Sequence, residues 1–328
     1  MSASVRAVAA CRGQRGDCRT GRLMRLAGKF SGFWIAPCHF MLFSDIVSPV
    51  SITAQEIKDV VRVEDDFGHE MRVGNILTNP QYPPFHFTQV RVMSPSHGGT
   101  YKDQVTDKTR QFDYRCQIVR GHQGTHNIFL AAECKNLNPD LPLVVCGRPR
   151  TKVESYHVYI ARTQDGERQL RIVEGSGSLY KPNGFVGKSL IRLKIKEKKL
   201  CADGDSEIYD KWSQALASSY DLAFSAAYNK SASQALAFIL PLVVVPDNSL
   251  WVVSYKDNGT PYGDPEKVDQ CPFYVDQKFL IGLPFVITHI HFVTLKGLSD
   301  MLSEFANADS DKWDLIFSHA SSEYNPTL

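Results

Sequence analysis

The chain has 328 residues, of which 43% are hydrophobic and 22% are charged, and its formal net charge at pH 7 is +2. These values are typical of an ordinary globular protein that buries a substantial core, as one large domain or two modest ones. They exclude a strongly basic chain, so any contact with nucleic acid has to come from a local basic groove.

The cysteines indicate a reducing compartment. The eight cysteines include no Cys-x-x-Cys pair, and several lie within apolar runs. This pattern favours buried, reduced thiols in a cytoplasmic protein over a zinc site or a disulfide framework.

Residues 1–43 differ in composition from the rest of the chain. Six arginines between Arg6 and Arg25 are opposed by Asp17 alone, and the apolar run 33–43 is interrupted by Pro37 and is too short to span a membrane. We expect a disordered basic extension here, with a targeting segment and a phosphate-binding arm as alternatives. No membrane partner is expected.

Two helices and a strand are predicted next. Thr53 and Glu56 have the spacing of a capping box, and residues 66–77 form a second helix that carries Glu70 and ends before Pro80. Residues 85–92 alternate between apolar and polar side chains, which predicts a strand.

The stretch 110–135 predicts a β-hairpin with charged side chains at one end. Residues 110–119 form its first strand, residues 121–124 its turn, and residues 128–135 an apolar second strand that ends in charges. Because side chains alternate along a strand, Glu133 and Lys135 share one face while Cys134 points into the core. The hairpin would set Asp113 near Glu133 and Lys135.

Two carboxylates and one ammonium on a sheet suit phosphodiester hydrolysis. Carboxylates are hard oxygen ligands for Mg²⁺, and a lysine can activate a metal-bound water or neutralise developing charge. The residues Asp113, Glu133, Cys134 and Lys135 make the chain resemble the PD-(D/E)xK nucleases, the restriction-endonuclease-like superfamily, over about 70–255. One departure from the motif is Phe112, which stands where the motif has proline.

The resemblance implies an α/β fold with a restriction-endonuclease-like mixed sheet flanked by helices. It also implies a Mg²⁺-dependent DNA endonuclease, with Mn²⁺ as an alternative ion, defence against foreign DNA as a role and a homodimer as a further expectation. Asp113 and Glu133 would hold the metal with the Cys134 carbonyl, Lys135 would activate water, and Glu70 would assist. Residues 44–328 would form a single domain with an insertion at about 140–205 and a C-terminal extension at about 256–328.

Basic residues near the hairpin are candidates for contacts with the DNA backbone. They lie in the polar loop before the Asp113 strand and in a cluster further along the chain: Lys108, Arg110, Arg148, Arg150 and Lys152. The segment 154–160 that follows the cluster could equally be a helix that covers the sheet.

Residues 208–228 form the clearest helix, with an apolar stripe that faces a sheet. Gln214, Ser218 and Asp221 lie on the opposite side of this helix, where we expect solvent. In the resembled family the helix after the Glu-x-Lys strand carries a polar residue toward the cleft, which makes Gln214 a further candidate.

The remaining elements complete an α/β domain. We expect residues 235–245 to form a central strand with a bulge or the first paired residue at Pro241, and residues 250–255 an antiparallel strand after it. Residues 256–275 would be a loop rich in proline and glycine. A strand at 285–292 would carry His289 and His291 on one face, and residues 298–305 would form an amphipathic helix.

Two other interpretations stay open. A catalytically inactive module with the nuclease fold would bind DNA or a protein partner without cutting. An unrelated α/β protein would have an ordinary charged strand end. Metal-dependent nicking of a plasmid separates the enzyme from the inactive module.

Overall fold

The computed structural model describes residues 53–58, 66–78, 90–93, 95–104, 106–121, 125–137, 141–163, 165–203, 206–228, 235–280, 282, 284–307, 309–317 and 322–323. The chain divides into residues 1–51 and 52–328, and every described residue belongs to the second unit. The basic extension expected at 1–43 therefore lies outside the described residues.

The two helix signals near the start are confirmed. The backbone N–H of Thr53 donates to Oε2 of Glu56 at 2.7 Å, and the N–H of Glu56 donates to Oγ1 of Thr53 at 3.2 Å, which completes the capping box. Helix α2 (Asp66–Thr78) begins and ends within one residue of the predicted bounds. Of the predicted strand 85–92, the described part is β1 (Val90–Val92).

The two strands of the predicted hairpin are confirmed, although the first begins at Tyr114 and not at residue 110, and residues 122–124 of the predicted turn lie outside the described residues. Strands β5 (Tyr114–Arg120) and β6 (His126–Cys134) pair antiparallel, with Tyr114 opposite Ala132. Asp113 directly precedes β5, and Glu133 is the last but one residue of β6. Ahead of them, β2 (Ser96–His97) pairs with β5, while β3 (Thr100–Lys102) and β4 (Thr109–Gln111) form a separate two-stranded sheet.

The centre of the large sheet is parallel. Strand β12 (Ala235–Val245) pairs with β6 on one side and with β16 (Pro284–Thr294) on the other. On the latter side β12 also pairs with β8 (Tyr156–Arg162) through residues 235–237, and its pairing with β16 starts at Leu242. Pro241 lies between these two ladders, so its missing N–H interrupts neither of them, and no bulge forms against β6.

The other strands extend the sheet on both sides of this centre. They are β7 (Leu143–Pro149), β9 (Arg168–Glu174), β10 (Phe185–Lys196), β11 (Lys199–Asp203), β13 (Leu250–Tyr255), β14 (Pro261–Lys267), β15 (Gln270–Leu280) and β17 (Ser322–Glu323). The main path through the sheet is β1-β5-β6-β12-β16-β15-β10-β7-β13-β14. Short 3₁₀ turns, η1 (Lys152–Glu154) and η2 (Gly175–Gly177), flank β8 and β9. The segment 154–160 is therefore largely strand, and its reading as a covering helix is wrong.

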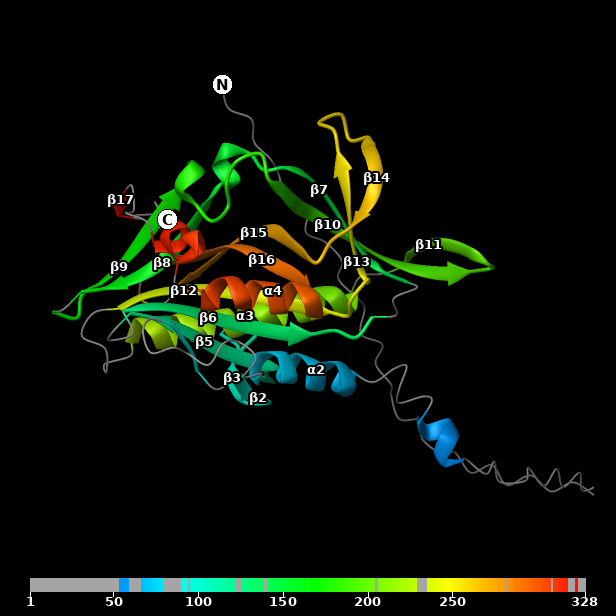
Figure 1. Ribbon diagram of the computed structural model, residues 1–328, viewed down its shortest axis with the longest axis horizontal. Helices are drawn as coiled ribbons and strands as arrows, with labels where there is room; N and C mark the ends of the chain where they lie inside the picture. Colours follow the sequence, from blue (N-terminus) through cyan, green and yellow to red (C-terminus); the bar gives the residue numbers. More distant parts are fainter. Residues whose placement is uncertain are drawn as a thin grey trace, which may run out of the picture. The chain divides into compact units, whose positions relative to one another are not determined.

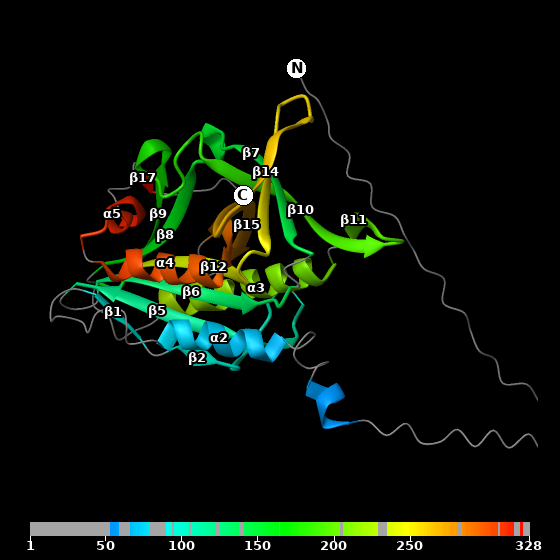
Figure 2. The same cartoon turned by 45° about the vertical axis from the view of Figure 1, so that its right-hand side comes forward.

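Two expectations about residues 250–275 are wrong. Strand β13 pairs in parallel with β7 and not antiparallel with β12, although β12 precedes it in the chain. The expected loop at 256–275 contains β14 and the start of β15, and β14 pairs antiparallel with β13. Figure 2 shows this β13–β14 hairpin projecting from the sheet.

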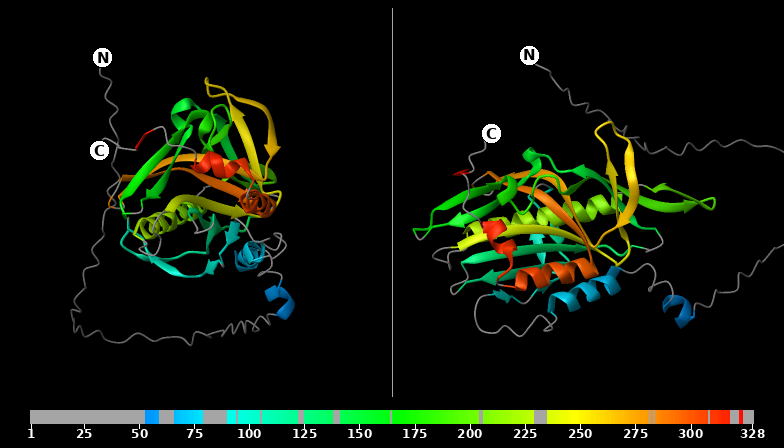
Figure 3. Two further views of the ribbon diagram at one scale, coloured as in Figure 1. Left: turned by 60° about the vertical axis from the view of Figure 1, so that its left-hand side comes forward. Right: turned by 45° about the horizontal axis from the view of Figure 1, so that its top comes forward.

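Helices cover both faces of the central strands. Alternate residues of β12, such as Leu240 and Val244, pack with α2, α4 (Leu295–Ala306) and α5 (Asp311–Phe317). The intervening residues, such as Ile239 and Val243, pack with α3 (Ser206–Tyr228). Figure 1 shows α2 and α4 beside β6, and the left panel of Figure 3 shows α3 enclosed by the curved sheet. The described part is thus α/β, with a large mixed sheet and few helices.

The side of α3 expected to face solvent is instead partly buried. Arg115 of β5 donates to Oγ of Ser218 at 3.0 Å and forms an ion pair of 2.7 Å with Asp221, and Ser218 is fully buried. The prediction failed because it assigned one sheet face to α3, whereas the sheet curves around the helix. Among the described residues, no helix is long and apolar enough to cross a membrane.

Gly147 lies where β7 and β10 approach too closely for a side chain. A Cβ at Gly147 would meet the carbonyl oxygen of Val186 at 2.1 Å, and a backbone atom cannot move aside as a side chain can. We expect Gly147→Ala to lower the free energy of unfolding by about 1–3 kcal/mol. A Cβ at Gly68, in α2, would meet nothing within 4 Å. Urea denaturation should therefore show Gly68→Ala as stable as the parent chain or more so, and equal stability of both variants would contradict this packing.

Candidate functional site

Asp113, Glu133 and a lysine from α3 form one charged cluster at the end of the β5–β6 hairpin. Nζ of Lys211 lies 2.7 Å from Oδ2 of Asp113 and 3.6 Å from Oε2 of Glu133. The same Asp113 oxygen accepts a hydrogen bond of 2.7 Å from the backbone N–H of Cys134. The structure thus brings together the two predicted acids, and the ammonium between them belongs to Lys211.

Glu133 is the buried member of the cluster. Its side chain is 0% exposed, and neither of its carboxyl oxygens has a hydrogen-bond partner in the structure. Burial and the charge of Asp113 raise the pKa of Glu133 well above its ordinary value, against the opposing effect of Lys211. A buried carboxyl without a hydrogen bond is unfavourable for folding, and such perturbed groups cluster at functional sites.

Lys211 keeps its positive charge in this setting. Burial lowers the pKa of its ammonium, but Asp113 and Glu133 outweigh burial, so the pKa is raised. A protonated lysine donates hydrogen bonds and neutralises anions but accepts no proton. Lys211 is therefore suited to electrostatic stabilisation and not to general-base catalysis.

Lys135 has different partners from those expected. Its Nζ lies 3.2 Å from Oδ2 of Asp66, at the start of α2, and 3.5 Å from Oε2 of Glu207, in the first turn of α3. Asp66 also accepts a hydrogen bond of 2.8 Å from the backbone N–H of Asn136. The assignment of Lys135 as the lysine of the acid pair is corrected, because Lys135 follows β6 and its ion pairs link the strand end to two helices.

Glu70 does not join the acid pair. Its carboxylate lies 3.4 Å from Nε2 of His97, and its helix α2 packs on the sheet face that carries Cys134, opposite to Glu133. In the part of the chain that the structure describes, no group of three or more His, Cys, Asp and Glu side chains is placed to hold a metal ion. Of the expected side-chain ligands, the structure brings together the carboxylates of Asp113 and Glu133, and the role of the Cys134 carbonyl stays a prediction.

Cys134 contributes through its backbone. Burial and the charge of Asp113 raise the pKa of the Cys134 thiol well above its ordinary value, so the thiol stays protonated. The side chain packs in the core, as its alternation with Glu133 predicts. Its N–H fixes one oxygen of Asp113, which orients that carboxylate toward Lys211.

Two aromatic rings cover α3 beside the cluster. Tyr101 and Phe112 pack with Ala217, and the Tyr101 hydroxyl donates to the carbonyl oxygen of Gln214 at 3.2 Å. Burial raises the pKa of Tyr101, and the charge of Glu133 adds to this effect. The contact of Gln214 in this region is made by its main chain.

Solvent reaches the cluster through Asp113 and Lys211. Their side chains are 13% and 17% exposed, whereas Glu133 is sealed beneath them. An ion or a substrate would meet Asp113 and Lys211 first. Access to Glu133 requires the Lys211 ammonium to move aside.

Two of the residues predicted to contact DNA, Arg150 and Arg110, form hydrogen bonds or ion pairs within the protein. The guanidinium of Arg150 is buried and donates to the carbonyl oxygens of Lys181 and Phe185, so its assignment to a DNA contact is corrected. Arg110 forms an ion pair of 2.6 Å with the buried carboxylate of Asp103.

The other three predicted DNA-contacting residues are more accessible. Lys108 and Lys152 are exposed. The side chain of Arg148 is 42% exposed and lies 3.5 Å from the carboxylate of Glu154. These three side chains lie at the surface, and their role stays a prediction.

Sequence reasoning did not single out Lys211. The helical spacing could have placed Lys211 on the buried face of α3. Lys211 is three residues after Ile208 and four before Ala215, and both of these residues are buried in one cluster. A lysine at this position either extends its ammonium to water or pairs with an anion, and in the structure it pairs with Asp113 and Glu133.

Comparison with protein-family models, with curated proteins and with solved structures finds no match to this chain.

Proposed function

We propose that the protein is a Mg²⁺-dependent DNA endonuclease that hydrolyses phosphodiester bonds at the cluster of Asp113, Glu133 and Lys211. The observation that carries the proposal is the convergence of two carboxylates and one ammonium from three separate segments of the chain. Glu133 stands on β6 and Asp113 directly precedes β5, which are the hairpin positions of the nuclease motif, although the lysine comes from α3.

The acid pair fits a magnesium ion. Magnesium binds proteins through one or two carboxylates and keeps several of its waters, so Asp113 and Glu133 suffice to hold it. The two Glu133 oxygens lack hydrogen-bond partners, so they could coordinate a cation that displaced the Lys211 ammonium, which lies 3.6 Å from Oε2. When bound there, the ion would polarise a phosphoryl oxygen and lower the pKa of a coordinated water. Mn²⁺, which prefers the same oxygen ligands, is the alternative ion.

Three further groups of the protein have separate roles in the proposed reaction. Lys211 would stabilise the negative charge that develops on the phosphate, because its ammonium stays protonated at the accessible side of the cluster. The Cys134 N–H holds the Asp113 carboxylate in place. Lys135 positions the end of β6 through Asp66 and Glu207.

The order of elements supports a restriction-endonuclease-like core. Helix α2 is followed by β1, the β5–β6 hairpin, α3 and β12, with β12 parallel to β6 and the two helices on opposite faces of the sheet. The strands β7 to β11 stand between β6 and α3 in the chain, at the position expected for an insertion.

The test is cleavage of supercoiled plasmid by the purified full chain. We expect nicked and linear products with Mg²⁺ or Mn²⁺ and none with EDTA. Asp113→Asn should lower the rate by at least about 100-fold, because a metal ligand is lost while the side chain keeps its size. Cleavage that is equally fast in this variant would assign the activity to a different site or to a contaminant.

A second candidate function is an inactive module that binds DNA without cutting it. The observation that favours this candidate is the complete burial of Glu133 beneath Lys211. A chain that retards DNA in a gel but leaves plasmid intact with either ion would establish it in place of the enzyme.

A further inference from the structure

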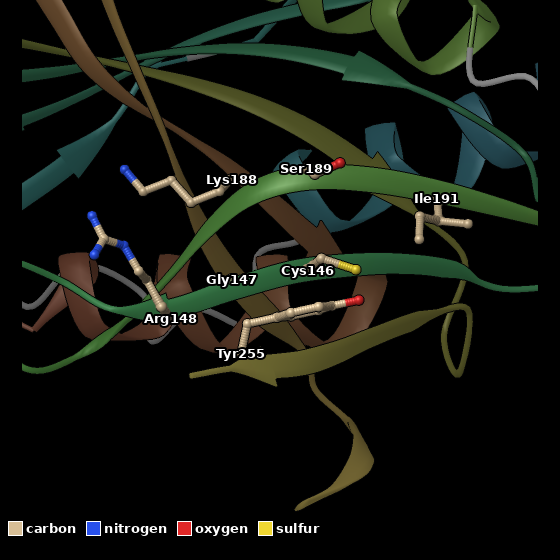
Figure 4. A pocket seen from close by; sticks show the side chains of 7 residues that line it. All are labelled: Cys146, Gly147, Arg148, Lys188, Ser189, Ile191 and Tyr255. Carbon is tan, nitrogen blue, oxygen red and sulfur yellow. The ribbon is translucent and has the colours of Figure 1, made fainter. Parts of the chain in front are cut away.

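A cavity lies on the sheet far along the strand order from the acid pair. Its volume is about 450 Å³, and it is lined by Cys146, Gly147, Arg148, Lys188, Ser189, Ile191 and Tyr255 from β7, β10 and β13 (Figure 4). This volume falls in the range of about 300–1,000 Å³ that is typical of small-molecule sites.

The cavity and the acid pair are on opposite faces of the sheet. Val145 of β7 and Leu190 of β10 pack in the cluster that contains α3. Side chains alternate along a strand, so Cys146 and Ser189 point to the other face. Glu133 shares the α3 face with Lys211. The cavity is therefore a separate site, and its role does not depend on the proposed nuclease activity.

The charged residues that line the cavity are both cations. Figure 4 shows the ends of Arg148 and Lys188 on the same side of it. One carboxylate, that of Glu154, serves both: its Oε1 lies 2.6 Å from Nζ of Lys188 and 3.5 Å from Nη2 of Arg148. The second partner of Arg148 is Asp257, at 3.7 Å, whose side chain is 96% exposed and screened by water. The guanidinium of Arg148 has five N–H donors, so it can still donate to a further anion.

The opposite end of the cavity is apolar and aromatic. Tyr255, Cys146 and Ile191 line it, and in Figure 4 the side chain of Tyr255 extends along it beneath Cys146. Burial raises the pKa of the Cys146 thiol, so this end is uncharged at neutral pH. A ring placed here can stack on Tyr255 while an anion reaches the two cations.

We propose that this cavity binds a nucleoside monophosphate, with its phosphate at Arg148 and Lys188 and its base beside Tyr255. Arginine pairs bidentately with phosphate, and lysine adds a point charge. The aromatic end favours a planar base over an inorganic anion alone.

The test is isothermal titration of the full chain with adenosine monophosphate, adenosine and inorganic phosphate in parallel. We expect adenosine monophosphate to bind more tightly than adenosine or inorganic phosphate. Its affinity should fall as the salt concentration rises. Lys188→Gln should weaken binding by about tenfold, the usual effect of losing one hydrogen bond to a charged group. Tyr255→Leu should weaken the binding of adenosine monophosphate and leave the binding of inorganic phosphate unchanged.

Lys194→Gln is the matched control. Lys194 lies on the same strand as Lys188 and also pairs with a carboxylate, Asp203, at 2.6 Å, but it does not line the cavity. Its variant should bind as the parent chain does. Because Lys188→Gln removes a partner of Glu154, thermal unfolding checks that this variant is folded, and Tyr255→Leu leaves that ion pair intact. The absence of monophosphate binding, or equal affinities in Lys188→Gln and Lys194→Gln, would overturn the proposal.

Discussion

Replacement of Lys211 by glutamine is expected to lower the rate of plasmid cleavage by at least about 100-fold, the usual effect of removing one preorganised charge from the reacting centre. The reason is the position of the Lys211 ammonium, 2.7 Å from Asp113 and 3.6 Å from Glu133. Lys211→Arg keeps the positive charge and should recover part of the rate. Single-turnover cleavage with excess protein measures the effect without a contribution from product release.

Lys135→Gln is the matched control for this prediction. Lys135 also carries an ammonium near the end of β6, but its ion pairs are with Asp66 and Glu207. Its variant should cleave within a few-fold of the parent chain and be somewhat less stable, since a partly buried ion pair is lost. Loss of cleavage in Lys135→Gln with retention in Lys211→Gln would restore the lysine of the sequence motif and reject the assignment made from the structure.

Replacement of Glu133 by glutamine is expected to abolish metal-dependent cleavage while leaving the fold at least as stable. The carboxylate that would hold the ion is lost, yet the buried group without a hydrogen bond becomes neutral at every pH. Lys211 keeps its closer partner Asp113, so no cation is left unpaired. We expect a gain in the free energy of unfolding of about 0.5–2 kcal/mol, as is found when strained site residues are replaced. Urea denaturation and plasmid nicking on the same preparation measure both effects.

The effect of Glu133→Gln on the free energy of unfolding should also depend on pH, in a direction that the pKa of Glu133 determines. Burial and Asp113 raise the pKa of Glu133 in the folded chain above that of the unfolded chain. The stability that goes with its protonated form is fully present below the unfolded pKa and is lost as pH rises through the folded pKa. The advantage of Glu133→Gln over the parent chain should therefore grow with pH. An advantage that shrinks with rising pH would show that Glu133 is held as a stabilised carboxylate.

The local part of the site could be predicted from the sequence. The apolar run that ends at Glu133 and the turn residues from Gly121 predict the β5–β6 hairpin, and its register alone brings Asp113 to Glu133. Helical periodicity predicts α3 almost to its ends. These features depend on contacts between residues that are near one another in the chain.

The non-local part could not be predicted. Lys211 meets Asp113 across 98 residues, and no short motif links them. Strand β13 pairs with β7 because the sheet continues beyond β16 through other strands, which local pattern does not specify. Strand β14 is exposed at every position and contains Pro261, Gly263 and Pro265, so its composition indicates a loop and its pairing with β13 makes it a strand.

The most direct test of the central claim is a count of the divalent ions bound to the acid pair. Titration of the full chain with Mn²⁺, followed by electron paramagnetic resonance of the free ion, should reveal at least one bound ion per chain. That ion should be lost in Asp113→Asn and in Glu133→Gln and retained in Glu70→Gln, because Glu70 contacts His97 on the other face of the sheet. Binding that is unchanged by the substitutions at Asp113 and Glu133, or no bound ion in the parent chain, would contradict a metal-dependent centre at this cluster.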